Sequence, residues 1–183
     1  EQRIIFGTYA VVDLVEGTGS TLFPLNFRHR PMAVLDGVAV FAADVQGFGE
    51  SVWRTDGTLA GTFRIPIGQS IVSSTNLAGT FATFQNEIFF LAARSSPSPG
   101  SRAIELWATD GTAAGTRLVR DLASTAEVTR IVMSTPNRLF FENAGNIWRS
   151  DGTTAGTSIV ASSAGGLAIV GDSAYFASDG ELW

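Results

Sequence analysis

The chain has no cysteine and a single histidine, His29, among its 183 residues. The lack of cysteine excludes disulfide bonds, thiolate zinc sites and thiol nucleophiles. One histidine leaves little room for a metal centre built from several imidazoles. Charged residues make up only 16% of the sequence, with a net charge of −5, and hydrophobic residues make up 45%. This balance predicts a folded core and no nucleic-acid partner, because a general nucleic-acid binder carries a basic surface.

Long apolar runs are also missing. None approaches the roughly 20 residues that cross a bilayer as a helix, so we predict no membrane insertion. The sequence starts at Glu1-Gln2-Arg3, without an initiator methionine or an apolar leader, which we interpret as a mature form or a fragment. The absence of cysteine is typical of an extracytoplasmic protein, and we expect a secreted or cell-surface location.

What the sequence does contain is a repeated phrase. It reads SVWRTDGTLAGT at 51–62, ELWATDGTAAGT at 105–116 and NIWRSDGTTAGT at 146–157, and a further copy begins with ELW at 181–183. Self-similarity of this kind predicts a repeat architecture. The units that we predict within a single domain, 1–183, are 16–67, 68–122, 123–161, and 162–183 together with 7–14.

Each unit is predicted to contain four short strands. In the first unit, 32–35 and 38–41 flank Asp36-Gly37, a dipeptide typical of a tight hairpin. The third strand, 51–55, and the fourth, 62–65, are separated by an Asp-Gly-Thr turn. Helical periodicity is absent. We therefore predict an all-β fold, a β-propeller of four four-stranded antiparallel blades, with a β-sandwich as the competing architecture.

The two ends of the sequence are predicted to complete each other. Residues 168–183 supply three strands of a last blade, and Gly7–Leu14 is similar to the fourth strand in Gly115–Leu122. We expect the ring to be closed by the N-terminal strand, Tyr9–Val12, completing that blade and removing its open edge. Two alternatives stay open: an eight-bladed ring formed by two chains, hence a possible homodimer, and a piece of a longer array.

The phrase in Glu105–Thr116 resembles the ELWxxDGT repeat of bacterial, mostly secreted or surface-associated proteins, and more distantly kelch-type propellers, which also place a tryptophan in the third strand. Val119-Arg120-Asp121-Leu122 fits the same pattern, whereas Val52 and Ile147 depart from its leucine position. The resemblance implies a repeat propeller outside the cytoplasm. It implies no chemistry, and fold analogy alone cannot supply one.

The repeated residues are predicted to be structural. The tryptophans occupy one repeat position, which is typical of packing between blades rather than of sugar stacking; they are Trp53, Trp107, Trp148 and Trp183. Each Asp-Gly-Thr turn offers one carboxylate, from Asp56, Asp110 or Asp151. Calcium needs roughly six to eight oxygen ligands, so we predict turn capping and no metal site.

Catalytic patterns are not evident either. His29 is the only candidate base for a Ser-His-Asp hydrolase, but it lies between Arg28 and Arg30, and the sequence has no Gly-x-Ser-x-Gly elbow. The innermost strands of the predicted blades, 32–35, 80–83, 131–134 and 167–170, contain no acid for glycoside hydrolysis. We expect no enzymatic activity and no cofactor.

The variable connections are the candidate binding surface. Those between the second and third strands, and between units, are predicted to share one face of the ring, at 15–31, 43–50, 68–79 and 93–104. They carry the residue types that dominate interface hot spots, namely Phe23, Phe27, Arg28, His29, Arg30, Phe48, Arg94 and Arg102. We expect a binding or adhesion module for an extracellular glycan or protein. The alternatives are a self-associating structural block and a propeller hydrolase.

Overall fold

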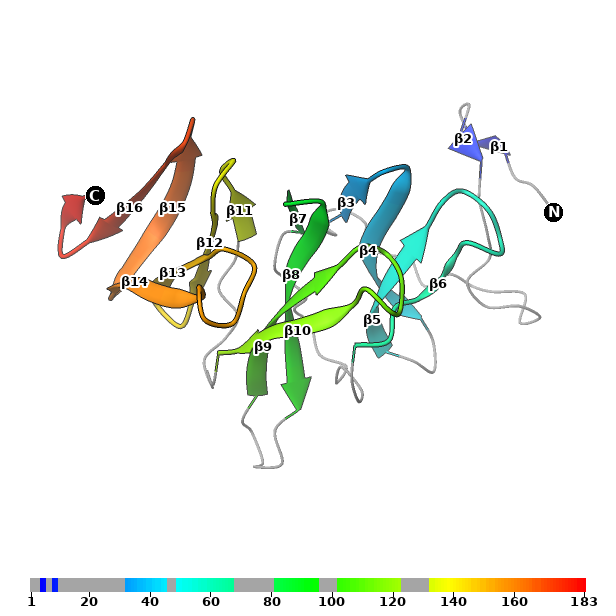
Figure 1. Cartoon of the computed structure of the whole chain (residues 1–183), viewed down its shortest axis with the longest axis horizontal. Coiled ribbons are helices and arrows are strands. Elements are labelled where there is room, and N and C mark those ends of the chain that lie inside the picture. Colours follow the sequence, from blue (N-terminus) through cyan, green and yellow to red (C-terminus); the bar gives the residue numbers. More distant parts are fainter. Residues whose placement is uncertain are drawn as a thin grey trace.

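The computed structural model describes residues 4–5, 8–9, 32–45, 49–67, 81–95, 102–122 and 132–183. Throughout these residues the chain forms strands and turns, without a helix. Near the N-terminus, β1 (Ile4–Ile5) and β2 (Thr8–Tyr9) form a two-stranded antiparallel sheet. The remaining strands form four antiparallel sheets that follow one another along the molecule (Figure 1). The predicted all-β class is confirmed.

Each of the four sheets consists of strands that are consecutive in the sequence. The first contains β3 (Met32–Leu35), β4 (Val38–Val45), β5 (Gly49–Thr55) and β6 (Phe63–Arg64). The second contains β7 (Ala82–Phe84), β8 (Glu87–Ser95), β9 (Arg102–Thr109) and β10 (Arg117–Asp121). The third contains β11 (Val132–Ser134), β12 (Leu139–Asn143), β13 (Asn146–Ser150) and β14 (Ser158–Ser162). The fourth has three strands, β15 (Ala164–Val170), β16 (Ser173–Ser178) and β17 (Glu181–Leu182).

The sequence repeat is also a repeat of strand register. In every sheet the tryptophan of the third strand lies directly opposite an aromatic residue of the second strand. The pairs are Phe41 with Trp53, Phe90 with Trp107, Phe141 with Trp148, and Phe176 with Trp183. Because one register places every side chain on a given side of its strand, corresponding residues of the four units face the same way.

The first hairpins of the first two sheets have tight turns. Asp36 and Gly37 both have positive φ, at 49° and 79°, and Gln85 and Asn86 have φ of 49° and 63°. Two central residues with positive φ are the mark of a type I′ turn, whose twist matches that of the flanking strands. The hairpin predicted at Asp36-Gly37 is confirmed.

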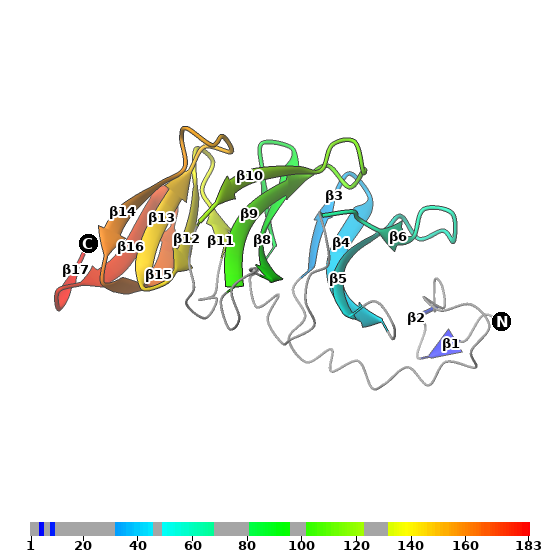
Figure 2. The same ribbon diagram turned by 90° about the horizontal axis from the view of Figure 1, so that it is seen from below.

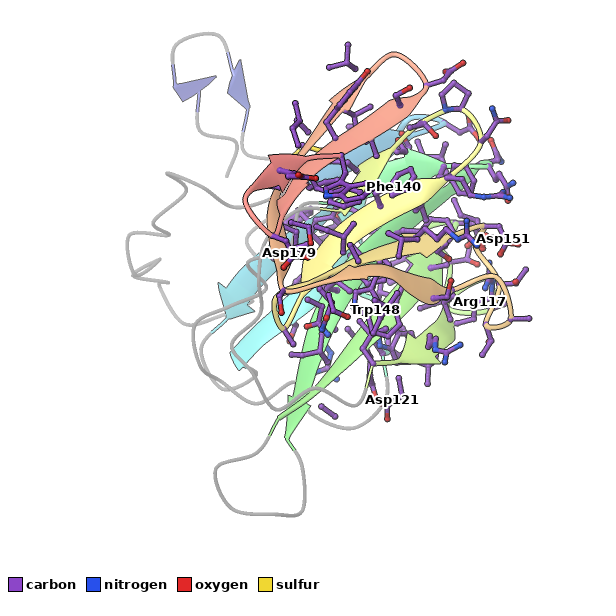
Figure 3. The ribbon with its side chains drawn as sticks, turned by 90° about the vertical axis from the view of Figure 1, so that its left-hand side faces the viewer. Arg117, Asp121, Phe140, Trp148, Asp151 and Asp179 are labelled. Carbon is purple, nitrogen blue, oxygen red and sulfur yellow. The ribbon has the colours of Figure 1, made fainter. Side chains whose placement is uncertain are left out.

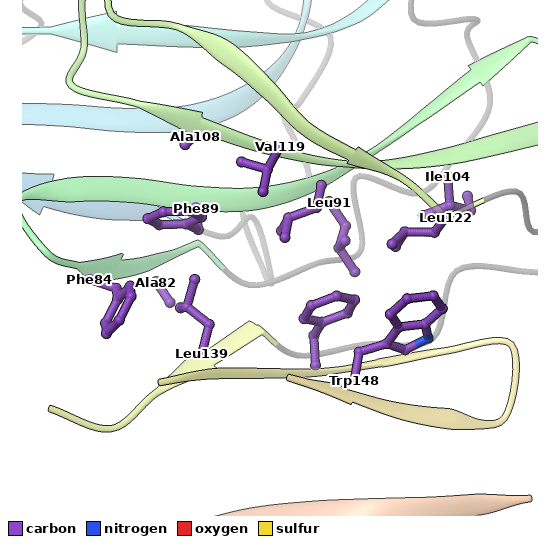
Figure 4. Packing of buried hydrophobic residues seen from close by; sticks show 12 residues of the cluster. Ala82, Phe84, Phe89, Leu91, Ile104, Ala108, Val119, Leu122, Leu139 and Trp148 are labelled. Carbon is purple, nitrogen blue, oxygen red and sulfur yellow. The ribbon is translucent and has the colours of Figure 1, made fainter. Parts of the chain in front are cut away.

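The sheets stack face to face, and apolar side chains fill the space between them (Figure 2). The largest apolar cluster lies between the second and third sheets (Figure 4). There Phe89 and Leu106, both 0% exposed, pack with Leu139 and Trp148. Alternation along each strand gives every inner sheet two apolar faces, one for each neighbour.

The other two interfaces use corresponding residues. Between the first and second sheets, Val52 and Ile65 pack with Ile88 and Phe90. Between the third and fourth sheets, Ile147 packs with Leu167, Ala164 and the half-buried Phe176. The sheets are therefore joined head to tail, and each offers one face to the unit before it and the opposite face to the unit after it.

The first strands of the four sheets converge. Residues of β3, β11 and β15, together with 81–83 in and beside β7, line one open hollow of about 480 Å³. Convergence of the first strands, with the later strands fanning outward, is a β-propeller-like arrangement. The described residues do not form a closed ring.

Two expectations about strands and connections are wrong. Residues 43–50 and 93–104 were predicted as connections, yet β4 pairs with β5 as far as Val45 and Gly49, and β8 pairs with β9 as far as Ser95 and Arg102. The connections are thus only 46–48 and 96–101. Backbone pairing continues through small and charged residues because ladder hydrogen bonds do not depend on apolar side chains.

The N-terminal strand also differs from its prediction. The backbone of Tyr9 pairs with Ile4 of β1, and the backbone of Trp183 pairs with Phe176. The sheets β1–β2 and β15–β17 lie at opposite ends of the molecule (Figure 2). The predicted pairing of Tyr9–Val12 with Glu181–Trp183 is therefore not found for Tyr9, and residues 10–12 lie outside the described residues.

Candidate ligand-binding edge

Antiparallel connectivity sorts the turns onto two edges of the stack. One edge, which we name the turn edge, carries the connections from first to second and from third to fourth strands. The other, the loop edge, carries the connections from second to third strands and those between sheets. Asp151 of the turn edge and Asp179 of the loop edge lie on opposite sides in Figure 3.

The turn edge is built from three Asp-Gly-Thr turns with one geometry. In the second sheet, Asp110 Oδ1 accepts hydrogen bonds from the backbone N–H and the hydroxyl of Thr112, at 2.8 and 2.7 Å. Asp56 and Asp151 make the same two bonds. Hydrogen bonds from the threonine hydroxyl and then the backbone lower the pKa of each of these carboxyl groups below its usual value. The aspartates cap their own turns.

A second set of hydrogen bonds closes each turn. The hydroxyls of Thr109 and Thr116 lie 2.7 Å apart across its base, and the Gly111 N–H donates to Thr109 Oγ1. The Gly115 N–H donates to the hydroxyl of Thr112. The first unit repeats this pattern, and the third does so with Ser150 in place of the first threonine. The polar groups of these turns are thus largely engaged within the turn.

The last position of the phrase requires glycine because a side chain there would have no room. A Cβ at Gly115 would overlap the Asp110 carboxylate, and the same holds for Gly61 with Asp56 and for Gly156 with Asp151. These glycines do not have positive φ, whereas the glycine of each Asp-Gly pair does. The two glycines of the phrase therefore serve different purposes.

Arginine side chains join neighbouring sheets along the turn edge. Arg54 Nη1 donates to the Gly111 carbonyl of the second sheet at 3.5 Å, and Arg117 Nη1 donates to the Gly152 carbonyl of the third at 3.0 Å. Arg117 also forms an ion pair with Glu87 at 2.6 Å and lies near Asp151 (Figure 3). Neither arginine was predicted from the sequence, because one is in a third strand and the other in a fourth.

The tryptophans lie within the sheets. Trp53 and Trp148 are each 8% exposed, and the Trp148 indole stacks on the Phe141 ring at 5.9 Å. Trp107 is half-buried, and its Nε1–H donates to the Glu105 carboxylate at 3.0 Å, which accounts for the Glu-x-Trp spacing in that unit. Trp183, by contrast, is 61% exposed.

Only part of the candidate ligand-binding set lies in the described residues. Arg94 in β8 pairs with Ala103, and Arg102 in β9 pairs with Ser95, so the two arginines occupy neighbouring strands at the loop-edge end of one hairpin. The other candidates lie outside the described residues; they are Phe23, Phe27, Arg28, His29, Arg30 and Phe48.

The hollow between the first strands offers little chemistry. Its lining includes Met32, Val34, Phe81 and Met133, with hydroxyls from Thr83 and Ser134, and none of the described residues that line it has a carboxylate, imidazole or basic side chain. Across the described part of the chain, no group of three or more histidine, aspartate or glutamate side chains could hold a metal ion. Within the same residues, no helix is long and apolar enough to cross a membrane.

Comparisons with known proteins add no assignment. No family model matches this chain, and no curated protein sequence matches it. The resemblance to ELWxxDGT repeats accordingly depends on the repeated phrase itself and on the strand register described above.

Proposed function

We propose that the chain is a non-enzymatic binding or adhesion module of the β-propeller type, secreted or held at the cell surface. The module presents its loop edge to an extracellular glycan or protein. The observation that carries this proposal is the difference between the two edges. On the turn edge, the same turn recurs three times, with its polar groups engaged internally or by arginines of the neighbouring sheet. A uniform and internally satisfied edge has little with which to distinguish partners.

The loop edge supports the proposal by its variation. Its hairpin connections range from the two residues 144–145 to the six residues 96–101, and the segments between sheets range from the single residue Ser163 to 65–81. Loops on a rigid scaffold commonly carry binding residues. Arginine near phenylalanine, on a protein with a net charge of −5, favours an anionic or polar ligand.

Completion of the propeller belongs to the same proposal. The alternatives are a four-bladed ring closed by the N-terminal strand, an eight-bladed ring of two chains, and a piece of a longer array. The pairing of Tyr9 with Ile4, and the position of β1–β2 far from β17, do not support the first of these (Figure 2).

The test compares arginines predicted to lie on the loop edge with arginines of the third sheet. The double variant Arg28→Ser/Arg30→Ser and the matched control Arg138→Ser/Arg149→Ser, whose residues are exposed in the third sheet, would be applied to an array of neutral, sialylated and sulfated glycans. We expect the first variant to lose binding and its salt sensitivity, with stability changed by no more than about 0.5 kcal/mol. Equal loss in the control, or no loss in the first variant, would contradict the proposal.

A further inference from the structure

Asp-Gly pairs occur in two different settings in this chain. The sequence contains five of them, of which three belong to the repeated phrase and two form tight turns with positive φ at both residues, Asp36-Gly37 and Asp179-Gly180. An Asp-Gly pair can rearrange without an enzyme, because the glycine nitrogen is tethered close to the carboxyl group of the aspartate before it. The absence of a glycine side chain lets the backbone rotate into the reactive geometry.

The rearrangement has two steps, and water is its only co-reactant. First, the glycine nitrogen bonds to the aspartate Cγ and loses its proton, while the carboxylic acid loses one oxygen as water, which gives a cyclic succinimide. Water then adds to one of the two ring carbonyls and breaks its bond to nitrogen. When it adds to the original backbone carbonyl, the chain continues through Cγ, and the product is isoaspartate with one additional methylene in the backbone.

The repeated phrase restrains both reacting groups. Asp56 Oδ1 accepts hydrogen bonds from the backbone N–H and the hydroxyl of Thr58, at 3.0 and 2.7 Å. The Gly57 N–H, which carries the attacking nitrogen, donates to Thr55 Oγ1 at 3.1 Å. The hydroxyl and then the backbone N–H of Thr58 also lower the pKa of Asp56, so that less of the reactive carboxylic acid is present. The other two copies repeat these bonds, at Asp110-Gly111 and Asp151-Gly152.

The pair Asp36-Gly37 lacks these restraints. The ladder of β3 and β4 ends at Leu35 and Val38, and within the described residues neither the Asp36 carboxylate nor the Gly37 N–H has a hydrogen-bond partner. Exposure does not distinguish this pair from Asp56-Gly57, because all four residues are exposed. The glycine conformation is also similar, with φ of 79° at position 37 and 88° at position 57. The two pairs therefore differ in hydrogen bonding.

Isomerisation at this turn would alter the first sheet. A type I′ turn joins its strands through two residues of ordinary backbone length, and isoaspartate lengthens that connection by one methylene. The turn connects β3 to β4, and Ala33 and Leu35 of β3 pack against the cluster between the first two sheets. The modified turn would therefore loosen a hairpin that contributes to the core.

We propose that Asp36-Gly37 is a site of spontaneous aspartate isomerisation in the folded protein, and that the hydrogen bonds of the repeated phrase protect the Asp-Gly pairs within it. These bonds then have two effects, since they cap the turn and keep the aspartate from reacting with its glycine. The proposal does not depend on ligand binding at the loop edge.

The test compares isomerisation rates in the folded and unfolded chain. The full chain would be incubated at physiological temperature and neutral pH, with and without urea, and digested at intervals for electron-transfer mass spectrometry, which distinguishes isoaspartate from aspartate. In urea we expect similar rates at Asp36 and Asp56. In the folded chain, Asp36 should react at least about tenfold faster, because releasing two ordinary hydrogen bonds changes a rate by about that factor. Equal rates in the folded chain, or an unreactive Asp36 when the urea sample reacts, would overturn the proposal.

A matched pair of variants tests the protection by the phrase. Thr58→Val removes the hydroxyl that donates to Asp56, whereas Thr58→Ser retains it. We expect faster isomerisation of Asp56 in Thr58→Val and the wild-type rate in Thr58→Ser, with the rate at Asp36 unchanged in both. Circular dichroism melting checks folding, and Thr112→Val with Thr112→Ser gives the same comparison at Asp110. A wild-type rate at the aspartate of a folded valine variant would contradict protection by these hydrogen bonds.

Discussion

At the scale of single residues, the repeated phrase is conserved within the chain because its members constrain one another. Asp110 caps the turn through Thr112, and the hydroxyl of Thr112 in turn receives the Gly115 N–H. The Asp110 carboxylate lies where a side chain at position 115 would have to be. A substitution at one of these positions therefore changes which side chains can be accommodated at the others.

Gly115→Ala is expected to destabilise the protein by about 1–3 kcal/mol, the usual cost of forcing a methyl group into filled space. The cause is overlap with Asp110, so the same substitution should cost clearly less in an Asp110→Ala background. Urea unfolding of the two single variants and the double variant measures this coupling. An equal loss of stability in both backgrounds would mean that the alanine strains the backbone at position 115 rather than overlapping Asp110.

At the scale of strands and sheets, the sequence predicts local structure well. The dipeptide Asp36-Gly37 identifies its hairpin because few residues accept positive φ, and the repeat of tryptophan identifies the third strands. The outer ends of β8 and β9 were not predictable, because Arg94, Ser95 and Arg102 carry no strand signal in the sequence, although their backbones are paired in the ladder.

The candidate site is predictable to a smaller degree. That Asp110 caps a turn follows from the Asp-Gly-Thr sequence, and the structure shows that cap. The contacts of Arg54 and Arg117 with turn carbonyls of the next sheet could not be predicted, because they depend on how far apart two sheets are stacked.

Trp148→Ala is expected to cost about 3–5 kcal/mol of the free energy of unfolding, because it removes a buried ring stacked on Phe141 from the largest cluster. Trp183→Ala is the matched control at the same repeat position, and it should cost less than about 1 kcal/mol because that side chain is 61% exposed. Denaturant unfolding at low protein concentration measures both. Similar costs for the two variants would mean that the fourth sheet is packed as tightly as the third.

At the scale of the whole molecule, apolar clusters formed by the described residues join four sheets in a row, and each of these clusters draws its residues from two neighbouring sheets. Stability in such an array is approximately a sum over units and their nearest-neighbour interfaces. Ile65 belongs to the interface between the first two sheets, and Ile147 to the interface between the last two. An entire sheet and the central cluster separate them.

Ile65→Val and Ile147→Val should each cost about 0.5–1.5 kcal/mol, and their effects should add to within about 0.3–0.5 kcal/mol in the double variant. Val52→Ala with Ile65→Val is the contrasting pair, since the Ile65 N–H donates to the Val52 carbonyl at 2.9 Å and both side chains lie in one cluster. That pair should depart from additivity by more than about 0.5 kcal/mol, because one cavity relaxes into the other. Unfolding of the three single and two double variants in urea gives both coupling energies. Coupling between Ile65 and Ile147 as large as that between neighbours would mean that the stack responds as one rigid body, and the description by nearest-neighbour interfaces would then be wrong.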